Sequence, residues 1–170
     1  MLRQDTGKES VIKRISSMTT TSSPAIVYAN NGGEYSYAIT DSFVGGQYIY
    51  GRGLGNVLDL QSPVTAIGQK GCSGCGYGQG FNAFNSTSGY TNSTTYTATS
   101  VTNSELGQTT KGHFGSTTFC MQADNTRTCA NNFVFFLYYS TTNYPEQSGW
   151  IGLGPQTSGN PPTIVQALRG

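Results

Sequence analysis

The sequence has few charged residues. Asp, Glu, Lys and Arg make up 10% of its 170 residues, and the formal net charge is +1. A chain with so little net charge has no electrostatic basis for attracting nucleic acid or a membrane surface, so we expect neither partner. No apolar run approaches the roughly 18 residues that a membrane-spanning helix needs. The longest, Phe133–Tyr139, has the length of a buried strand, and we expect no membrane insertion.

Metal ligands are also scarce. His113 is the only histidine, and the four cysteines form two local pairs, Cys72-x2-Cys75 and Cys120-x8-Cys129. The second pair lacks zinc-knuckle spacing. The first pair lies in a glycine-rich loop rather than at the start of a helix, where a redox CxxC motif would be expected. Zinc and redox chemistry are the alternatives to two local disulfides, Cys72–Cys75 and Cys120–Cys129, which fit best. We expect no metal site and no cofactor.

Hydroxyl side chains, glycine and tyrosine are abundant. Ser and Thr together account for 41 residues, and there are 23 Gly and 11 Tyr. This composition is typical of an extracellular β protein, and the length suits one domain. Two N-x-S/T sequons, Asn85–Thr87 and Asn92–Thr94, predict glycans on Asn85 and Asn92, although a polar loop in any compartment would also fit. The N-terminus lacks the apolar segment of a signal peptide, so we expect either a processed chain or a fragment.

The chain divides into two parts. Residues 1–24 form a basic segment that ends in a Ser/Thr linker, and residues 25–170 form the folded domain. Helix is expected at residues 8–15 and again near the end, where Pro161-Pro162 sets the first turn. The remaining pattern is of short strands divided by Gly, Asn and Pro, so the fold class is mainly β with a short C-terminal helix. The expected strands are residues 25–29, 34–40, 47–51, 56–60, 64–68, 94–101, 113–122 and 132–139.

An Asp-Thr-Gly tripeptide occurs at residues 5–7. This tripeptide carries the catalytic carboxylate in aspartic peptidases. Here its neighbours are Arg3, Gln4, Lys8 and Glu9, which favour solvent, whereas a catalytic carboxylate must lie at the end of apolar strands. We therefore expect Asp5 or Thr6 to cap the helix at residues 8–15 rather than to form an active site.

Three separate elements resemble another part of the same family. The stretch NVLDLQSPVTAIGQKGCSGC at residues 56–75 contains two apolar strands, an acidic residue between them and a small Cys loop. The stretch SGWIGLGP at residues 148–155 is similar to a hydrophobic-Gly motif, and PPTIVQALRG at residues 161–170 resembles the helix that follows it. In this order and spacing they resemble the N-terminal lobe of the pepsin-like aspartic peptidases, from about Tyr35 to Gly170. The resemblance implies one lobe of six-stranded-type β-sheets packed into a partly open barrel.

The resemblance places the catalytic position at Asp59. In the family the next residues are Thr, whose hydroxyl ties the active-site loops together, and Gly, which offers its N–H to the carboxylate. Here they are Leu60 and Gln61, which we expect to spoil the donors around the carboxylate. Ser62 matches the serine that follows the Gly, and it could still bond the carboxylate.

Two further family features are missing. The hairpin that should carry a Tyr over the substrate has none, and Asn103 or Ser104 falls near that place; Ser148 stands where an acidic residue is usual. The sequence also supplies no second catalytic Asp, whereas the mechanism needs two carboxylates that share a proton. The other acidic residues lie in no matching motif and are expected to be solvated: Glu34, Asp41, Glu105, Asp124 and Glu146.

These departures predict a secreted, glycosylated, catalytically inactive lobe that acts as a binding, structural or assembly module. The alternative is the N-terminal half of an active aspartic endopeptidase completed by a second lobe. An unrelated secreted β-sandwich or surface fibre protein, whose motifs match by chance, is a third possibility. A single lobe leaves one face open, so we expect a second lobe, self-association or a peptide or protein ligand to cover it.

Overall fold

A computed structural model describes residues 26–30, 36–40, 42–49, 56–75, 80–104, 106–123, 126–142 and 149–169. Within these ranges the protein is mainly β with one short helix, which confirms the predicted fold class. The basic segment and the helix expected at residues 8–15 lie outside the described residues. The elements are β1 Ile26–Asn30, β2 Ser36–Thr40, β3 Ser42–Val44, β4 Gln47–Ile49, β5 Asn56–Asp59, β6 Ala66–Ser73, β7 Thr91–Asn92, β8 Ser100–Asn103, β9 Gln108–Ala123, β10 Thr126–Thr141, β11 Gly149–Gly152 and α2 Ile164–Ala167.

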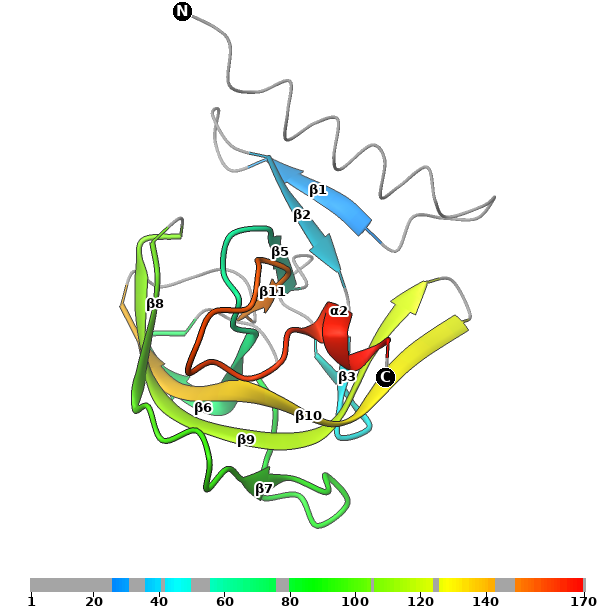
Figure 1. The fold of residues 1–170 in the computed structure, drawn as a ribbon, viewed down its shortest axis with the longest axis vertical. Helices are drawn as coiled ribbons and strands as arrows, with labels where there is room; N and C mark the ends of the chain where they lie inside the picture. Colours follow the sequence, from blue (N-terminus) through cyan, green and yellow to red (C-terminus); the bar gives the residue numbers. More distant parts are fainter. Residues whose placement is uncertain are drawn as a thin grey trace, which may run out of the picture.

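The strands form one open, mixed sheet (Figure 1). Their order is β1-β2-β5-β11-β6-β10-β9-β3-β4, and β7 and β8 also pair with β9. β11 is parallel to β5 and antiparallel to β6, and β6 is parallel to β10. The consecutive strands β5 and β6 are thus separated by β11, which comes from far along the chain. The segment that joins β5 to β6 must therefore cross the end of β11.

Strand β10 is apolar on both faces, as the run at residues 133–139 predicts. Alternate side chains of a strand point to opposite faces, and β10 accordingly contributes Phe135 to one cluster and Phe136 to another. The helix-side cluster contains Val44, Ile49, Ile67, Phe81, Phe119, Ala130, Phe133, Phe135, Leu137, Ile151 and Ile164. The hairpin-side cluster contains Val57, Val64, Ala66, Phe114, Phe136, Tyr138 and Trp150.

Helix α2 packs on the helix-side cluster and lies across the sheet in Figure 1. Thr163 forms a capping box with Gln166, because the side chain of each bonds the backbone of the other. The helix follows Pro161-Pro162 as predicted but has only four residues. No helix among the described residues is long and apolar enough to cross a membrane.

Several strands differ from the sequence prediction, among them β8 and β3. Most of the alternating stretch 94–101 is not a strand: only Ser100 and Val101 belong to β8, while the ring of Tyr96 packs on Phe114 at 5.9 Å between centroids. Tyr96, the large side chain in this alternating stretch, therefore packs on the hairpin-side cluster without being part of a strand. β3 was not predicted, although the Gly45-Gly46 turn after it, with φ of +53° and +75°, is a signal for a two-residue hairpin.

Candidate functional site

Asp59 is the last residue of β5, and the loop at residues 60–65 follows it across the end of β11. Three bonds tie this loop to the C-terminal end of β11. The backbone N–H groups of Leu153 and Gly154 donate to the carbonyls of Asp59 (2.7 Å) and Ser62 (2.9 Å). The N–H of Gly152 donates to the Thr65 hydroxyl at 3.1 Å. Residues almost a hundred positions apart in the sequence therefore fix the position of the Asp59 backbone.

The Asp59 carboxylate is buried, with 4% of the residue exposed, and both of its oxygens accept hydrogen bonds. Oδ1 accepts from the backbone N–H groups of Gln61 at 2.8 Å and Ser62 at 3.1 Å. Oδ2 accepts from the side-chain Nδ2 of Asn103 at 2.6 Å. These three donors supply the compensation that a buried carboxylate requires.

We expected Gln61 to disrupt the hydrogen-bond donors around the carboxylate. For the backbone N–H donors this expectation is wrong. The N–H of Gln61 still reaches Oδ1, and the Gln61 side chain is exposed, so it does not obstruct that approach. Ser62 also bonds the carboxylate, but through its backbone N–H. Its hydroxyl instead donates to the Val64 carbonyl and accepts from the Val64 N–H. The loop is therefore held by bonds from the Gln61 and Ser62 backbone to Asp59 and by bonds between the Ser62 hydroxyl and Val64.

Asn103 closes the site from the opposite side. It ends β8 at the tip of the β8–β9 hairpin and is 2% exposed. Its Nδ2 donates to Asp59, and its Oδ1 accepts from the N–H of Leu106 at 3.0 Å, which closes the turn. The neighbouring Ser104 is exposed. Of the two residues that the sequence placed near the flap position, the structure therefore brings Asn103 to Asp59.

Apolar side chains of the hairpin and of the segment before it pack against the core. Tyr96, Val101 and Leu106 pack against the hairpin-side cluster. At the centre of that cluster Trp150 is fully buried and stacks on Tyr138, with ring centroids 6.1 Å apart and an interplanar angle of 20°. The indole N–H of Trp150 has no hydrogen-bond acceptor among the described residues. Burial also raises the pKa of the Tyr138 phenol.

Asp59 is the only acidic side chain among the described residues. The other seven, Asp5, Glu9, Glu34, Asp41, Glu105, Asp124 and Glu146, all lie outside them, so the structure gives no account of their solvation. No group of three or more His, Cys, Asp or Glu side chains that could hold a metal ion occurs in the described part. His113 lies on β9, where its ring is 6.1 Å from that of Tyr90.

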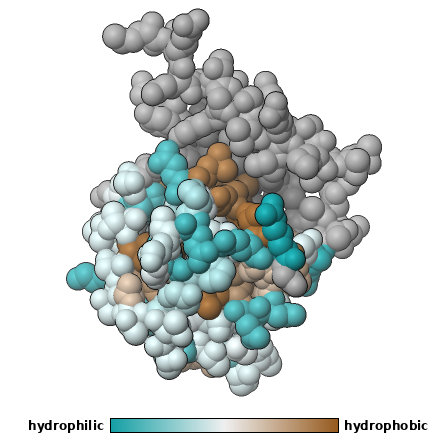
Figure 2. Space-filling model, viewed as in Figure 1, coloured by the Kyte–Doolittle hydropathy of each residue, from teal (hydrophilic) through white to brown (hydrophobic). Residues whose placement is uncertain are grey.

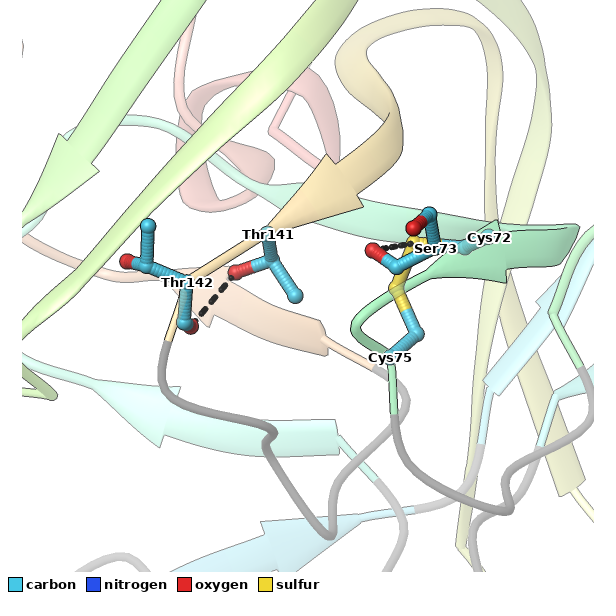
Figure 3. Close-up of a disulfide and its surroundings, with 5 residues drawn as sticks. All are labelled: Cys72, Ser73, Cys75, Thr141 and Thr142. Atoms are coloured by element: carbon cyan, nitrogen blue, oxygen red, sulfur yellow. Dashed lines mark hydrogen bonds between the residues drawn. A yellow bond between two sulfur atoms is a disulfide. The ribbon is translucent and has the colours of Figure 1, made fainter.

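Both predicted disulfides are present: Cys72 bonds Cys75, and Cys120 bonds Cys129. Cys120 and Cys129 are directly opposite each other on β9 and β10, which explains why a pair nine residues apart can bond. The Cys72–Cys75 loop lies beside the end of β10, near Thr141 and Thr142 (Figure 3). Two disulfides are compatible with an extracellular location.

Both sequon asparagines are exposed. Asn85 lies between two consecutive turns, and its Oδ1 accepts from the N–H and the hydroxyl of Thr87 at 3.1 and 3.0 Å. Asn92 lies in β7, opposite Gly115 of β9. Solvent access, which a bulky glycan requires, is therefore available at both positions.

Comparison with known proteins adds no family assignment. Neither a scan against models of known protein families nor a search of curated proteins finds a match.

Proposed function

We propose that this chain forms a pepsin-like lobe that does not cleave peptides by itself and acts as a secreted binding or assembly module. The observation that carries the proposal is the hydrogen bond of 2.6 Å from Asn103 Nδ2 to Asp59 Oδ2. Together with the two backbone donors on Oδ1, it commits the buried carboxylate to joining the β5–β6 loop and the β8–β9 hairpin.

The chemistry of the aspartic peptidases supports this proposal. Their mechanism needs two carboxylates about 3 Å apart that share one proton, so that one acts as base and the other as acid. Among the described residues Asp59 has no such partner, because no other acidic side chain is present there. The Asp59 carboxylate is paired instead with the amide of Asn103, which is a hydrogen-bond donor and not a second carboxylate.

The packing under the hairpin supports it as well. A peptidase needs room for a substrate between the hairpin and the sheet, whereas here Leu106 and Tyr96 pack against the hairpin-side cluster. The open sheet offers a different way to bind. β1 and β4 end the strand order, and among the described strands each pairs with one neighbour. Such edges can accept another strand, so a second lobe or a second copy of the chain is the partner that we favour.

The secretory part of the proposal includes glycans on Asn85 and Asn92. It is supported by the exposure of both residues and by the two disulfides. Intact-mass measurement of the secreted protein, before and after glycosidase treatment, tests it. We expect a mass decrease that corresponds to two glycans, and an unchanged mass would contradict glycosylation.

A peptidase assay tests the catalytic part. The chain is incubated at pH 3–5 with a denatured protein substrate, with and without an aspartic-peptidase inhibitor, beside Asp59→Asn. We expect no inhibitor-sensitive cleavage. Inhibitor-sensitive cleavage that disappears in Asp59→Asn would overturn the proposal, whereas cleavage that survives Asp59→Asn would come from a contaminant or another site.

The second candidate is the N-terminal half of an active aspartic endopeptidase. It is favoured by one observation, the pair of backbone N–H donors on Asp59 Oδ1, which position the carboxylate despite Leu60 and Gln61. In this case a second lobe would supply the other carboxylate, and its docking would have to displace Asn103. The same assay on the product of the full open reading frame distinguishes the two candidates, because activity that appears only there and requires Asp59 would favour the endopeptidase.

A further inference from the structure

Phe84 differs from the other phenylalanines of the protein. It is 85% exposed, whereas six of the other seven are buried to 3% exposure or less, and Phe43 packs on Tyr48 with 5.0 Å between ring centroids. A single exposed apolar side chain is common on protein surfaces and needs no special cause. What sets Phe84 apart is its neighbour, because the next residue is the sequon asparagine Asn85.

The loop that carries both residues is held firmly. Two consecutive turns are closed by bonds from the N–H of Asn85 to the Asn82 carbonyl (3.2 Å) and from the N–H of Ser88 to the Asn85 carbonyl (2.9 Å). Gln47 of β4 bonds both the N–H and the carbonyl of Asn82 at 2.9 Å. At the other end, the hydroxyl of Thr117 on β9 donates to the Ser88 carbonyl. The turn is therefore anchored to the sheet on both sides of Phe84 and Asn85.

The asparagine side chain is free for modification in this turn. Its Oδ1 accepts both bonds from Thr87, and neither bond uses Nδ2, the atom to which a glycan attaches. Asn85 is exposed and is one residue, or 3.8 Å between Cα atoms, from Phe84. A sugar on Nδ2 is thus attached one residue from the exposed aromatic ring, on a turn that these hydrogen bonds hold in place.

We propose that the first sugar of a glycan on Asn85 packs its apolar C–H face on the ring of Phe84. The face of an aromatic ring carries negative charge density, and it attracts the polarised C–H groups of a pyranose in the way that it attracts the positive edge of another ring. The contact also removes apolar surface of Phe84 from water. Because the turn is anchored, little backbone entropy is lost when the contact forms.

The second sequon provides a matched control within the same molecule. Asn92 lies on β7, and the nearest preceding aromatic residue, Tyr90, is partly buried and packs on Phe81 and Phe135. Its ring is engaged in the helix-side packing and does not offer an open face. A glycan on Asn92 is therefore not expected to gain the same contact.

This inference rests on the proposed glycosylation, so the experiment measures occupancy and stability separately. The chain is secreted from a glycosylating eukaryotic host as wild type, Asn85→Gln, Phe84→Ala and the double variant, and site occupancy is determined by peptide mass mapping. Thermal unfolding then gives Tm for each protein. Both substitutions are on exposed side chains, so we expect all four proteins to fold.

We expect Asn85→Gln to lower Tm by about 2–4 °C when Phe84 is present, and by less than about 1 °C in the Phe84→Ala background. Asn92→Gln should lower Tm by less than about 1 °C. An equal decrease in both backgrounds would overturn the stacking contact, because it would reflect a general effect of the glycan. An unoccupied Asn85 would overturn glycosylation at this site and the contact with it, while leaving the proposal of an inactive lobe untouched.

Discussion

The two apolar clusters on either side of β10 share the same strand but differ in what they bury with it. The helix-side cluster consists of aliphatic and aromatic side chains under α2 and the loop at residues 80–90. The hairpin-side cluster contains Trp150, whose N–H has no acceptor among the described residues, and the Asp59–Asn103 bond lies at the tip of the hairpin that packs on it. Among the described residues, the buried carboxylate of Asp59 therefore lies on the hairpin side of the sheet.

This difference indicates which side is specialised. A purely apolar cluster is explained by stability alone, because each buried side chain adds favourable transfer energy. A buried carboxylate has a cost unless several donors compensate for it, so its presence needs a separate cause. Here that cause is the connection that the carboxylate makes between the β5–β6 loop and the β8–β9 hairpin. Figure 2 shows a mostly polar outer surface on the described residues of the viewed face, with smaller apolar areas.

The largest effects are expected for truncations of β10. Phe135→Ala on the helix side and Phe136→Ala on the hairpin side should each lower the free energy of unfolding by about 3–5 kcal/mol, because both rings are fully buried. Hydrogen exchange should separate them, since only Phe136→Ala is expected to speed exchange in the β8–β9 hairpin. Equal exchange in the hairpin of both variants would contradict the separation of the two clusters.

Alkaline pH should affect both sides. Burial raises the pKa of Tyr90, against the helix-side cluster, and of Tyr138, in the hairpin-side cluster, above the ordinary value of 10.0. The neutral phenols are therefore favoured in the folded state, and the resulting stability is complete below pH 10 and is lost as the pH rises above it. Tyr138 should account for a loss of up to about 1.4 kcal/mol by pH 11, and the partly exposed Tyr90 for a smaller loss because solvent screens it.

Denaturant unfolding of Tyr90→Phe and Tyr138→Phe between pH 9 and pH 11 measures these losses. Each variant should lose less stability over this range than the wild type. Tyr139→Phe, which removes a phenol that is 49% exposed, is the matched control variant. If all three variants lost as much free energy of unfolding between pH 9 and pH 11 as the wild type, the assignment of this loss to the buried phenols would be contradicted.

The smallest effect is expected at Trp150, whose indole N–H has no acceptor among the described residues. Trp150→Phe should change the free energy of unfolding by less than about 1 kcal/mol, because the cost of a smaller ring is offset by removal of a buried N–H that has no acceptor. Ile151→Val, the next residue on the helix side, should cost about 0.5–1.5 kcal/mol with no such offset. Unfolding should be followed by circular dichroism, because Trp150 is the only tryptophan and its replacement removes the tryptophan fluorescence that would otherwise report unfolding. A cost of about 3 kcal/mol for Trp150→Phe would indicate that the N–H has a partner.

Much of the fold could be predicted from local pattern. The two-faced strand β10 follows from the apolar run at residues 133–139, and both disulfides follow from the spacing of the cysteines. The strand that ends in Asp59 was also expected. In contrast, β11 follows from no local pattern, because four residues with glycine at each end become a strand only when β5 and β6 flank them.

The site could be predicted in part. Asp59 was singled out, and Asn103 or Ser104 was assigned to the place of the flap tyrosine, with no contact to Asp59 predicted for either. The sequence did not show that the backbone N–H of Gln61 would still reach the carboxylate, because that depends on the path of a loop fixed by β11. Nor did it show that Asn103 would turn inward, because a hairpin tip rich in polar residues usually faces solvent.

The central claim is that Asp59 acts through Asn103 as a structural acceptor, and a double-mutant cycle tests it most directly. The free energies of unfolding of Asp59→Ala, Asn103→Ala and the double variant are compared at neutral pH, with Ser104→Ala as the exposed control. We expect each single variant to lose about 1–3 kcal/mol and the double variant to lose at least 1 kcal/mol less than the sum, because each single change leaves a buried polar partner without its bond. Single losses that add within about 0.5 kcal/mol would show that the two residues do not interact, and would contradict the account.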